Sequence, residues 1–176
     1  MNKGKQGFTL IEILIVVAII AILASVVLVG LGPTQQAGRD ARRLSDIRQV
    51  QNALELFYNK CGYYPGTIAA GVCAVGSPGA TWTAMGTMLT AAGLGVSSVP
   101  GDPSSNRSYG YAWGTGNTAY VLGVALESTN NGVFNGYTAP TIPAGATWVT
   151  DAVTIKPDPA CGKALPAGSA TYCVAL

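Results

Sequence analysis

The sequence predicts an α+β protein in which one long N-terminal helix precedes a small antiparallel β-sheet. Residues 8–31 form an apolar run of 24 residues, long enough for a helix that crosses a lipid bilayer. Residues 37–57 carry apolar side chains at spacings of three and four, the period of an amphipathic helix. Glycine and proline then divide residues 62–176 into short runs typical of strands and turns. The length of 176 residues allows one domain with an appendage.

The composition excludes several classes of enzyme. The chain contains no histidine, which excludes Ser-His-Asp and Cys-His catalysis and disfavours a zinc enzyme. Charged residues make up 10% of the chain, against roughly 25% in an ordinary soluble domain. The net charge of +2 lacks the strongly basic footprint of a nucleic-acid-binding protein. We therefore expect no enzyme, no catalytic residue, no metal and no cofactor, but a protein that packs against other surfaces.

The apolar run is the first predicted element. Residues 13–29 contain one serine and no charged residue. A helix over residues 8–31 would be about 36 Å long, and a bilayer core is about 30 Å thick. A cleaved signal peptide is the alternative, because Lys3 and Lys5 suit its basic region. The run is longer than a signal peptide needs, and the nearest small-x-small candidate, Gly30-Leu31-Gly32, is followed directly by Pro33. A membrane-spanning helix is therefore favoured.

Glu12 is the one acidic residue near this run. A carboxylate at the centre of a membrane helix costs roughly 2.5–3.5 kcal/mol on insertion scales, so it usually has a partner. It could reach water at the membrane interface, or it could pair with a cation. No Lys or Arg lies between Lys5 and Arg39. Cleavage after Gly7 would create such a cation, the α-amino group of Phe8.

These residues carry a family resemblance. Residues 5–12, Lys-Gln-Gly-Phe-Thr-Leu-Ile-Glu, and the apolar run after them resemble the class III signal of type IV pilins and type II secretion pseudopilins. The resemblance implies that a prepilin peptidase cuts between Gly7 and Phe8 and that Phe8 becomes an N-methylated phenylalanine. It also implies that Glu12 serves in assembly. The implied partners are the membrane before assembly, an inner-membrane assembly platform, and further copies of the chain in a helical filament.

Gly30, Gly32 and Pro33 predict a break in the helix, because proline lacks a backbone donor and disfavours helix at the residue before it. In related filaments the corresponding stretch loses helicity on assembly, and the resemblance implies the same here. Residues 34–60 then form the amphipathic half of the helix. We assign its arginines to a solvated face or to ion pairs between neighbouring subunits, and not to nucleic acid, because Asp40, Asp46 and Glu55 lie among them. The polar side of this half carries Arg39, Arg42, Arg43, Asp46, Arg48, Gln49 and Gln51.

The remainder of the chain is predicted to be a β-rich head over residues 61–176. Residues 84–94 favour a short helix and residues 99–103 a loop. Residues 108–113 and 120–126 favour the two strands of a hairpin. The first of these strands would place Tyr109, Tyr111 and Trp113 on one face, and residues 114–117 would make the turn.

Residues 147–155 and 171–175 are two further candidate strands, so three or four antiparallel strands are expected. Residues 41–65 and 100–127 resemble the stem and head of pilins and major pseudopilins. The resemblance implies the ladle-shaped pilin fold. Its parts would be a leader over residues 1–7, a membrane or filament-core half over residues 8–33, and the amphipathic half and head given above.

Four cysteines follow the apolar run, and an even number outside the cytoplasm predicts two disulfides. Three pairings are open. We favour the two sequential pairs, in which each closes a local loop; the alternative is metal binding by four thiolates. The residues are Cys61, Cys73, Cys161 and Cys173. Calcium ligands could be drawn from Asp102, Glu127, Asp151 and Asp158, but these form no tight carboxylate loop, and we predict no metal site.

The predicted function is that of a structural subunit of a type IV pilus-like filament, which polymerises through its N-terminal helix. A surface pilus of this kind would serve bacterial adhesion or motility. One alternative is a pseudopilin of a type II secretion system. An alternative of another class is a membrane-anchored surface-binding module that keeps residues 1–7 and stays monomeric. The subunit is expected in the cytoplasmic membrane with its head outside the cytoplasm, and after assembly in an extracellular filament.

Overall fold

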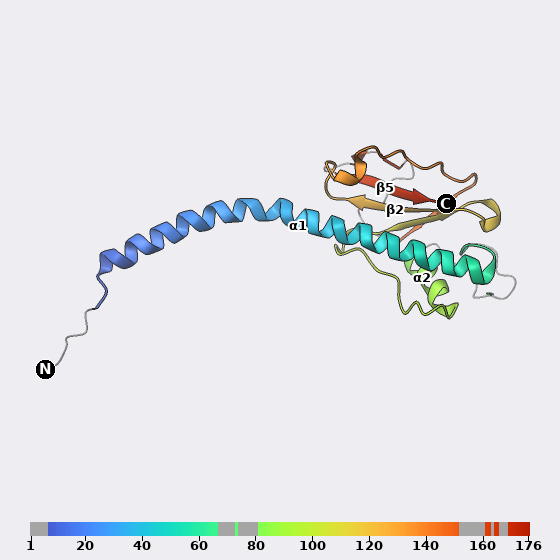
Figure 1. Ribbon diagram of the computed structural model, residues 1–176, viewed down its shortest axis with the longest axis horizontal. Coiled ribbons are helices and arrows are strands. Elements are labelled where there is room, and N and C mark those ends of the chain that lie inside the picture. Colours follow the sequence, from blue (N-terminus) through green and yellow to red (C-terminus); the bar gives the residue numbers. More distant parts are fainter. Residues whose placement is uncertain (1–6, 67–72, 74–80, 152–160, 163, 166–168) are drawn as a thin grey trace. The chain divides into compact units, whose positions relative to one another are not determined.

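The computed structural model describes residues 7–66, 73, 81–151, 161–162, 164–165 and 169–176. It confirms the α+β prediction: a long helix is followed by a short helix and an antiparallel sheet (Figure 1). The chain divides into two compact units, residues 1–36 and residues 37–176. The five strands found among the described residues all fall in the second unit.

Helix α1 runs without interruption over Leu10–Cys61. Its first part belongs to the first unit, and its side chains are exposed wherever their burial is described. Its second part belongs to the second unit. There one stripe of the helix is buried, because apolar side chains recur every three or four residues. The stripe comprises Ile47, Val50, Ala53, Leu54 and Phe57.

Helix α2 spans Trp82–Ala91. It begins two residues earlier than the sequence predicted, because the Thr81 side chain caps it by accepting the N–H of Ala84 at 3.1 Å. It also ends earlier than predicted. The residue after its C-cap, Gly93, has φ +64°, a left-handed conformation that stops a helix.

The sheet contains five antiparallel strands in the order β3-β1-β2-β5-β4. The predicted hairpin is confirmed: β1 pairs with β2 from Gly110 opposite Gly123 to Trp113 opposite Tyr120. Four of the strands have four to seven residues, within the predicted number, and β4 adds two residues at one edge. The strands are β1 Gly110–Trp113, β2 Tyr120–Leu126, β3 Thr147–Thr150, β4 Ala164–Leu165 and β5 Ser169–Ala175.

Three predicted strands differ from the observed ones. β1 begins at Gly110, two residues after the predicted Ser108, where its pairing with β2 and β3 starts. β3 ends at Thr150, and residues 152–155 of the predicted strand lie outside the described residues. β5 begins two residues before the predicted Thr171, because Ala170 pairs with Leu126 at the end of β2. Two 3₁₀ helices, Thr115–Asn117 and Gly132–Phe134, lie in the connections.

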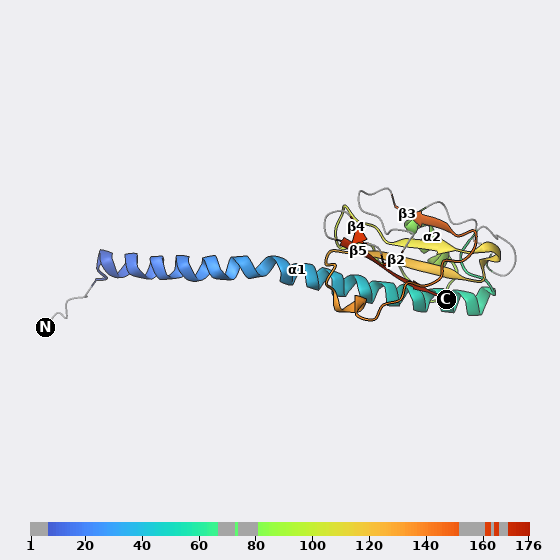
Figure 2. The same cartoon turned by 90° about the horizontal axis from the view of Figure 1, so that it is seen from above.

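The sheet has two buried faces within the second unit. The face toward α1 and α2 holds the main core, and alternate residues of β1 and β2 contribute to it. Tyr109, Tyr111 and Trp113 all lie in this core, as predicted. The opposite face packs Ala112 and Val121 against Cys161 and Cys173, which form a disulfide. Figure 2 shows the same elements after a quarter turn.

Candidate processing and assembly site

The candidate site lies at the start of α1. Gly7, Phe8 and Thr9 precede the helix, which begins at Leu10. All three residues are exposed, and the Phe8 side chain is 86% exposed. The Gly7–Phe8 peptide bond therefore lies in non-helical, accessible backbone within this chain.

Thr9 and Glu12 form a reciprocal pair across the first helical turn. The Thr9 backbone N–H and the Thr9 hydroxyl both donate to Oε2 of Glu12, each at 2.9 Å. The Glu12 backbone N–H reaches Oγ1 of Thr9 at 3.3 Å. This is a capping box, in which the N-cap and the third helical residue satisfy donors that the helix leaves unpaired.

The sequence analysis missed this role of Glu12. The pattern Thr-x-x-Glu before an apolar run would have predicted it. Both donors from Thr9 reach the same carboxylate oxygen, Oε2. Among the described residues, none donates a hydrogen bond to Oε1 and none forms an ion pair with Glu12. One carboxylate oxygen is thus available to a cation from outside the described part of this chain.

The apolar surface after Glu12 is continuous. Helix α1 contains an 18-residue window with a mean hydropathy of 3.3 and none of it is buried within the chain. By length and composition it can cross a membrane. Side chains around the whole circumference are exposed, including Ile13, Leu14, Ile15, Val16 and Val17. Such a surface needs lipid or other helices around it.

The predicted break at Gly30, Gly32 and Pro33 is absent from this chain, and α1 is helical through all three residues. Pro33 removes one N–H donor, so one carbonyl four residues earlier loses its partner while the rest of the helix keeps its hydrogen bonds. The hydroxyl of Thr34 adds a bond to the carbonyl of Gly30 at 3.1 Å. Loss of helicity on assembly stays a prediction.

The second unit contains a buried ionic cluster that the sequence analysis placed wrongly. Arg43 was expected on a solvated face or in ion pairs between subunits. Its side chain has no exposed surface, and it contacts three carboxylates of the same chain. These are Asp40 at 2.9 Å, Asp102 at 2.8 Å and Glu127 at 2.7 Å.

Two further groups complete the cluster. Arg39 donates to both carboxylate oxygens of Glu127, and the Ser104 hydroxyl accepts from Arg43 at 2.9 Å. Asp40 accepts the backbone N–H groups of Glu127 and Ser128 at 2.9 and 3.0 Å. We define the ionic cluster as Arg39, Asp40, Arg43, Asp102, Ser104 and Glu127.

The electrostatics of the cluster follow from these contacts. Hydrogen bonds from Arg39 and Arg43 outweigh the effect of burial and lower the pKa of Glu127 from 4.5 to about 2. Burial of Arg43 disfavours its charge, but hydrogen bonds to Asp102 and Glu127 outweigh burial and raise its pKa. Glu127 and Arg43 therefore stay charged near neutral pH. Asp102 and Glu127, considered above as calcium ligands, bind arginine instead.

The two other acidic residues weighed as calcium ligands lie elsewhere. Asp151 accepts the backbone N–H and the hydroxyl of Thr83 at the start of α2. Asp158 lies outside the described residues. Within the part of the chain that the structure describes, no group of three or more acidic or sulfur-bearing side chains could hold a metal ion.

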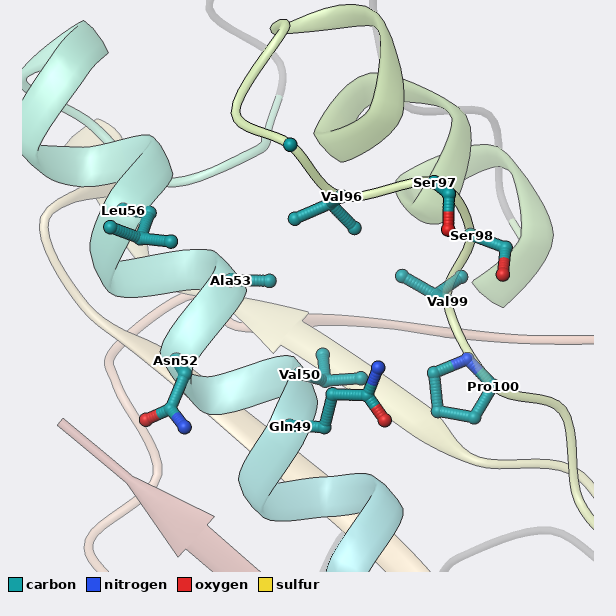
Figure 3. A pocket seen from close by; sticks show the side chains of 11 residues that line it. Gln49, Val50, Asn52, Ala53, Leu56, Val96, Ser97, Ser98, Val99 and Pro100 are labelled. Carbon is teal, nitrogen blue, oxygen red and sulfur yellow. The ribbon is translucent and has the colours of Figure 1, made fainter.

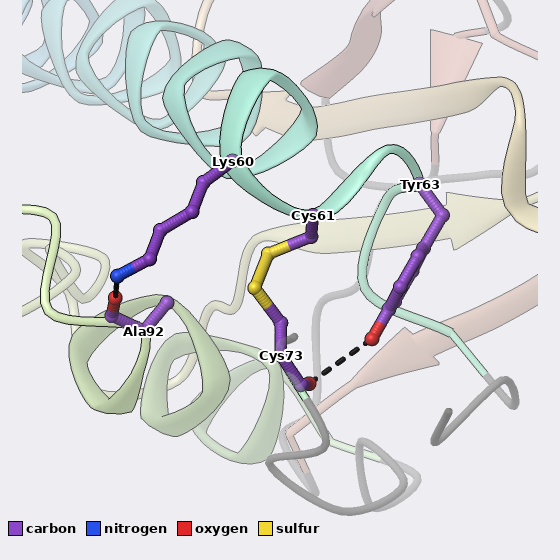
Figure 4. The surroundings of a disulfide bond; sticks show 5 residues. All are labelled: Lys60, Cys61, Tyr63, Cys73 and Ala92. Carbon is purple, nitrogen blue, oxygen red and sulfur yellow. Dashed lines mark hydrogen bonds between the residues drawn. A yellow bond between two sulfur atoms is a disulfide. The ribbon is translucent and has the colours of Figure 1, made fainter. Parts of the chain in front are cut away.

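The four cysteines form two disulfides, Cys61–Cys73 and Cys161–Cys173. This is the sequential pairing that the sequence analysis favoured. The first disulfide ties the last residue of α1 to Cys73, whose carbonyl accepts the hydroxyl of Tyr63 at 3.0 Å (Figure 4). The second fixes Cys161 to β5, where the Tyr137 hydroxyl bonds both the N–H and the carbonyl of Cys173.

A hollow of about 200 Å³ lies between α1 and the connection that follows α2 (Figure 3). Figure 3 shows side chains of α1 on one side and residues 96–100 on the other. No charged or catalytic side chain lines it. The lining residues are Gln49, Val50, Asn52, Ala53, Leu56, Gly95, Val96, Ser97, Ser98, Val99 and Pro100. Ser97 and Ser98 contribute hydroxyl groups to it, but no acidic or basic side chain lines it that could activate them.

The comparisons with known proteins agree with the site at the start of α1. Residues 2–28 match the family model of the prokaryotic N-terminal methylation motif. The match covers Gly7, Phe8, Thr9 and Glu12 and much of the apolar helix. The chain therefore carries at its N-terminus the methylation motif on which its resemblance to type IV pilins and pseudopilins rests. The pilins and pseudopilins that carry this motif are structural subunits and not enzymes.

Curated relatives of this pilin-like chain are core proteins G of type II secretion systems. The protein of Aeromonas hydrophila is 37% identical over 68 residues, which cover 38% of this chain and 48% of the relative. The protein of Escherichia coli K12 is 36% identical over 63 residues, covering 36% and 43%. That of Vibrio cholerae is 36% identical over 65 residues, covering 37% and 44%.

The chain thus spans less than half the length of the curated relatives that it matches. No solved structure is significantly similar to it. The N-terminal apolar helix and the prepilin motif together indicate an inner-membrane prepilin.

Proposed function

We propose that this chain is a pseudopilin, a subunit of the short filament of a type II secretion system. Its partial similarity to several core proteins G of such systems is the observation that carries the proposal. The site at the start of α1 supports it, because the expected cleavage point is exposed and the expected assembly acid has one free oxygen.

The first step of the proposed mechanism is processing. A prepilin peptidase hydrolyses the Gly7–Phe8 bond, which leaves a carboxylate on Gly7 and an amine on Phe8. Methylation of that amine keeps its positive charge. The exposed, non-helical backbone before Leu10 suits a protease, since proteases bind extended substrate.

The second step is docking of one subunit onto another in the membrane. The Phe8 amine of one copy pairs with Oε1 of Glu12 on its neighbour. Pairing removes an uncompensated charge from an apolar environment, where a lone charge is strongly unfavourable. The pairing also sets the axial register of the two helices. The Thr9 bonds to Oε2 can persist during this step, because they use the other oxygen.

The third step is packing of the stems. Residues 8–33 of many copies form the filament core, and residues 30–33 lose helicity as they pack. Residues 34–60 stay on the head of their own subunit, and residues 61–176 complete that head. Residues 1–7 are removed as the leader. The inner-membrane assembly platform extracts each subunit, and the filament extends outside the cytoplasm.

A surface pilus would assemble by the same cleavage, methylation and charge-pairing steps, and a pilus subunit was the first prediction from the sequence. The comparisons favour the secretion alternative, and neither they nor the structure support adhesion or motility. The monomeric surface-binding module is disfavoured by the match to the methylation motif.

The proposal is tested with two substitutions of one residue. Glu12→Gln keeps the length of the side chain and removes its negative charge. It also keeps the capping box, because glutamine serves at this position of the box as well. Glu12→Ala removes both. Both variants should be cut before Phe8, as N-terminal sequencing would show, and both should fail to form filaments. Normal filament yield from Glu12→Gln would contradict the charge-pairing step.

The system to which the filament belongs is tested by deleting the chain from its host. Loss of secreted proteins from the culture medium, with surface pili unchanged in electron micrographs, is expected of a pseudopilin. Loss of abundant surface pili with normal secretion would instead identify a pilus subunit.

A further inference from the structure

The ionic cluster lies where α1 enters the folded unit of residues 37–176. Asp40 is the first buried residue of α1 within that unit. The residues before it, from Ala37 back to Leu10, are exposed where their burial is described. Any force applied to the helix from its N-terminal side therefore reaches the cluster before it reaches the apolar stripe.

The strand beside α1 runs in the opposite direction to the helix. At one end of β2, the Tyr120 hydroxyl donates to Glu55 at 3.1 Å. At its other end, the N–H of Glu127 donates to Asp40 at 2.9 Å. Pulling the helix toward its N-terminus while holding the β1–β2 turn therefore slides the two elements past each other.

The contacts along this interface differ in kind. Among the described residues, eight hydrogen bonds of the cluster join α1 to the rest of the unit. Six of them come from guanidinium groups to Asp102, Ser104 or Glu127. Farther along α1, single hydrogen bonds from the Tyr109 hydroxyl to Asp46 and from the Tyr120 hydroxyl to Glu55 join the helix to the rest of the unit. Beside them Ile47, Leu54 and Phe57 make apolar contacts, which are not directional and resist sliding less.

We propose that the ionic cluster is a mechanical fastener that keeps α1 attached to the head when the helix is pulled along its axis. Sliding by one or two ångströms breaks the bidentate bonds of Arg43 to Asp102 and of Arg39 to Glu127 together. It also leaves buried carboxylates without partners before water can reach them. The barrier to separation is therefore concentrated at residues 39–43.

The fastener goes beyond the proposed secretion role, because it concerns the response of the single chain to force. It would serve any process that moves the subunit by its helix. A failure of filament assembly in cells would not bear on it, since its test uses one molecule.

The test is single-molecule pulling of the full chain in detergent. Handles are attached at the exposed positions Ala37 and Thr118 through azide-bearing side chains, so both disulfides stay intact. Thr118 lies in the β1–β2 turn, next to Asn117, whose carbonyl accepts the N–H of Tyr64 beyond the C-terminus of α1. This geometry loads the helix and the sheet in shear.

Three variants are compared with the unsubstituted chain. Glu127→Gln and Ser104→Ala each weaken the cluster while preserving its packing. Phe57→Leu weakens the apolar stripe at the far end of the same helix, and its equilibrium stability is measured by urea unfolding. The lifetime of the folded state at one fixed force is then compared between the variants. Each lifetime is first scaled for the free energy of unfolding that the variant loses at equilibrium.

At an equal loss of equilibrium stability, we expect Glu127→Gln to shorten the lifetime of the folded state under force about tenfold more than Phe57→Leu does. The reason is that losing one charge-assisted hydrogen bond changes a rate by about a factor of ten. Ser104→Ala should shorten it in the same direction by less. Equal scaled lifetimes for the cluster variants and Phe57→Leu, or a shorter one for Phe57→Leu, would overturn the proposal.

Discussion

Thr9 and Glu12 face each other across the first turn of α1 and satisfy one another's backbone donors. Glu12, for which we propose a role in assembly, thus also caps the first turn of the helix. This double use explains why a charge can stand at the head of an apolar helix before any partner is present: its carboxylate already accepts two hydrogen bonds.

The capping box can be tested through Thr9. Replacing Thr9 with Ala removes the hydroxyl that accepts the Glu12 N–H, and loss of an N-cap costs about 0.5–2 kcal/mol of helix stability. We expect the amides of the first turn to exchange with solvent about tenfold faster, measured by hydrogen exchange in detergent. Thr9→Ser should keep the slow exchange. Equal exchange in Thr9→Ala and the unsubstituted chain would show that the box does not hold the turn.

The ionic cluster can be tested by a matched pair of arginine substitutions on one helix. Arg43→Met leaves three carboxylates beside an apolar side chain, and breaking a buried ion pair on one side costs about 3–5 kcal/mol. Arg48→Met changes an exposed arginine and should stay within about 0.5 kcal/mol. Urea unfolding of both variants measures the difference. Similar stability of the two would contradict the burial of Arg43.

The stability of the head should depend on pH through the ionisation of Glu127. Its pKa is about 2 in the folded chain and 4.5 without the arginine contacts, so the folded state holds the ionised form more strongly. The resulting stabilisation is complete above about pH 4.5 and is lost as the pH falls toward 2. Urea midpoints measured from pH 7 to pH 2 should fall in that window.

Glu127→Gln is the control for this pH dependence. It removes the titrating group, so its midpoints should fall less between pH 4.5 and pH 2 than those of the unsubstituted chain. A parallel fall in both proteins would assign the acid sensitivity to other carboxylates.

The two disulfides should stabilise the head separately. Each closes a sequence separation of 12 residues, for which the chain-entropy model gives roughly 2–3 kcal/mol. The double variants Cys61→Ser/Cys73→Ser and Cys161→Ser/Cys173→Ser should each lower the thermal midpoint, measured by circular dichroism. Reduction with dithiothreitol should lower the midpoint of each variant further, because the other bond remains. No further change on reduction would mean that the second bond contributes nothing.

Much of the fold could be predicted because it follows local periodicity. The hairpin of β1 and β2 was predicted from the alternating aromatic residues of the first strand and from the turn residues 114–117, which act over a few positions. The extra residues of β5 could not, because Ser169 and Ala170 are poor strand formers. They extend because β2 and β4 pair with them.

The site was predicted in part for the same reason. Gly7, Phe8 and Glu12 lie in one short pattern, and the capping box was readable from it. The ionic cluster was not readable, since Arg43 binds Asp102 and Glu127 across 59 and 84 residues of sequence. Helical periodicity alone does not distinguish a buried arginine from an arginine that is exposed to solvent.

The bond from Asp40 to the backbone of Glu127 also fixes an order of events during biosynthesis. Its two ends are 87 residues apart in the chain. At a synthesis rate of about 5–20 residues per second, roughly 4–17 seconds pass between their appearances. Throughout that interval Asp40 and Arg43 are exposed to water. The newly made chain is therefore a membrane helix with an unfolded tail before its head folds.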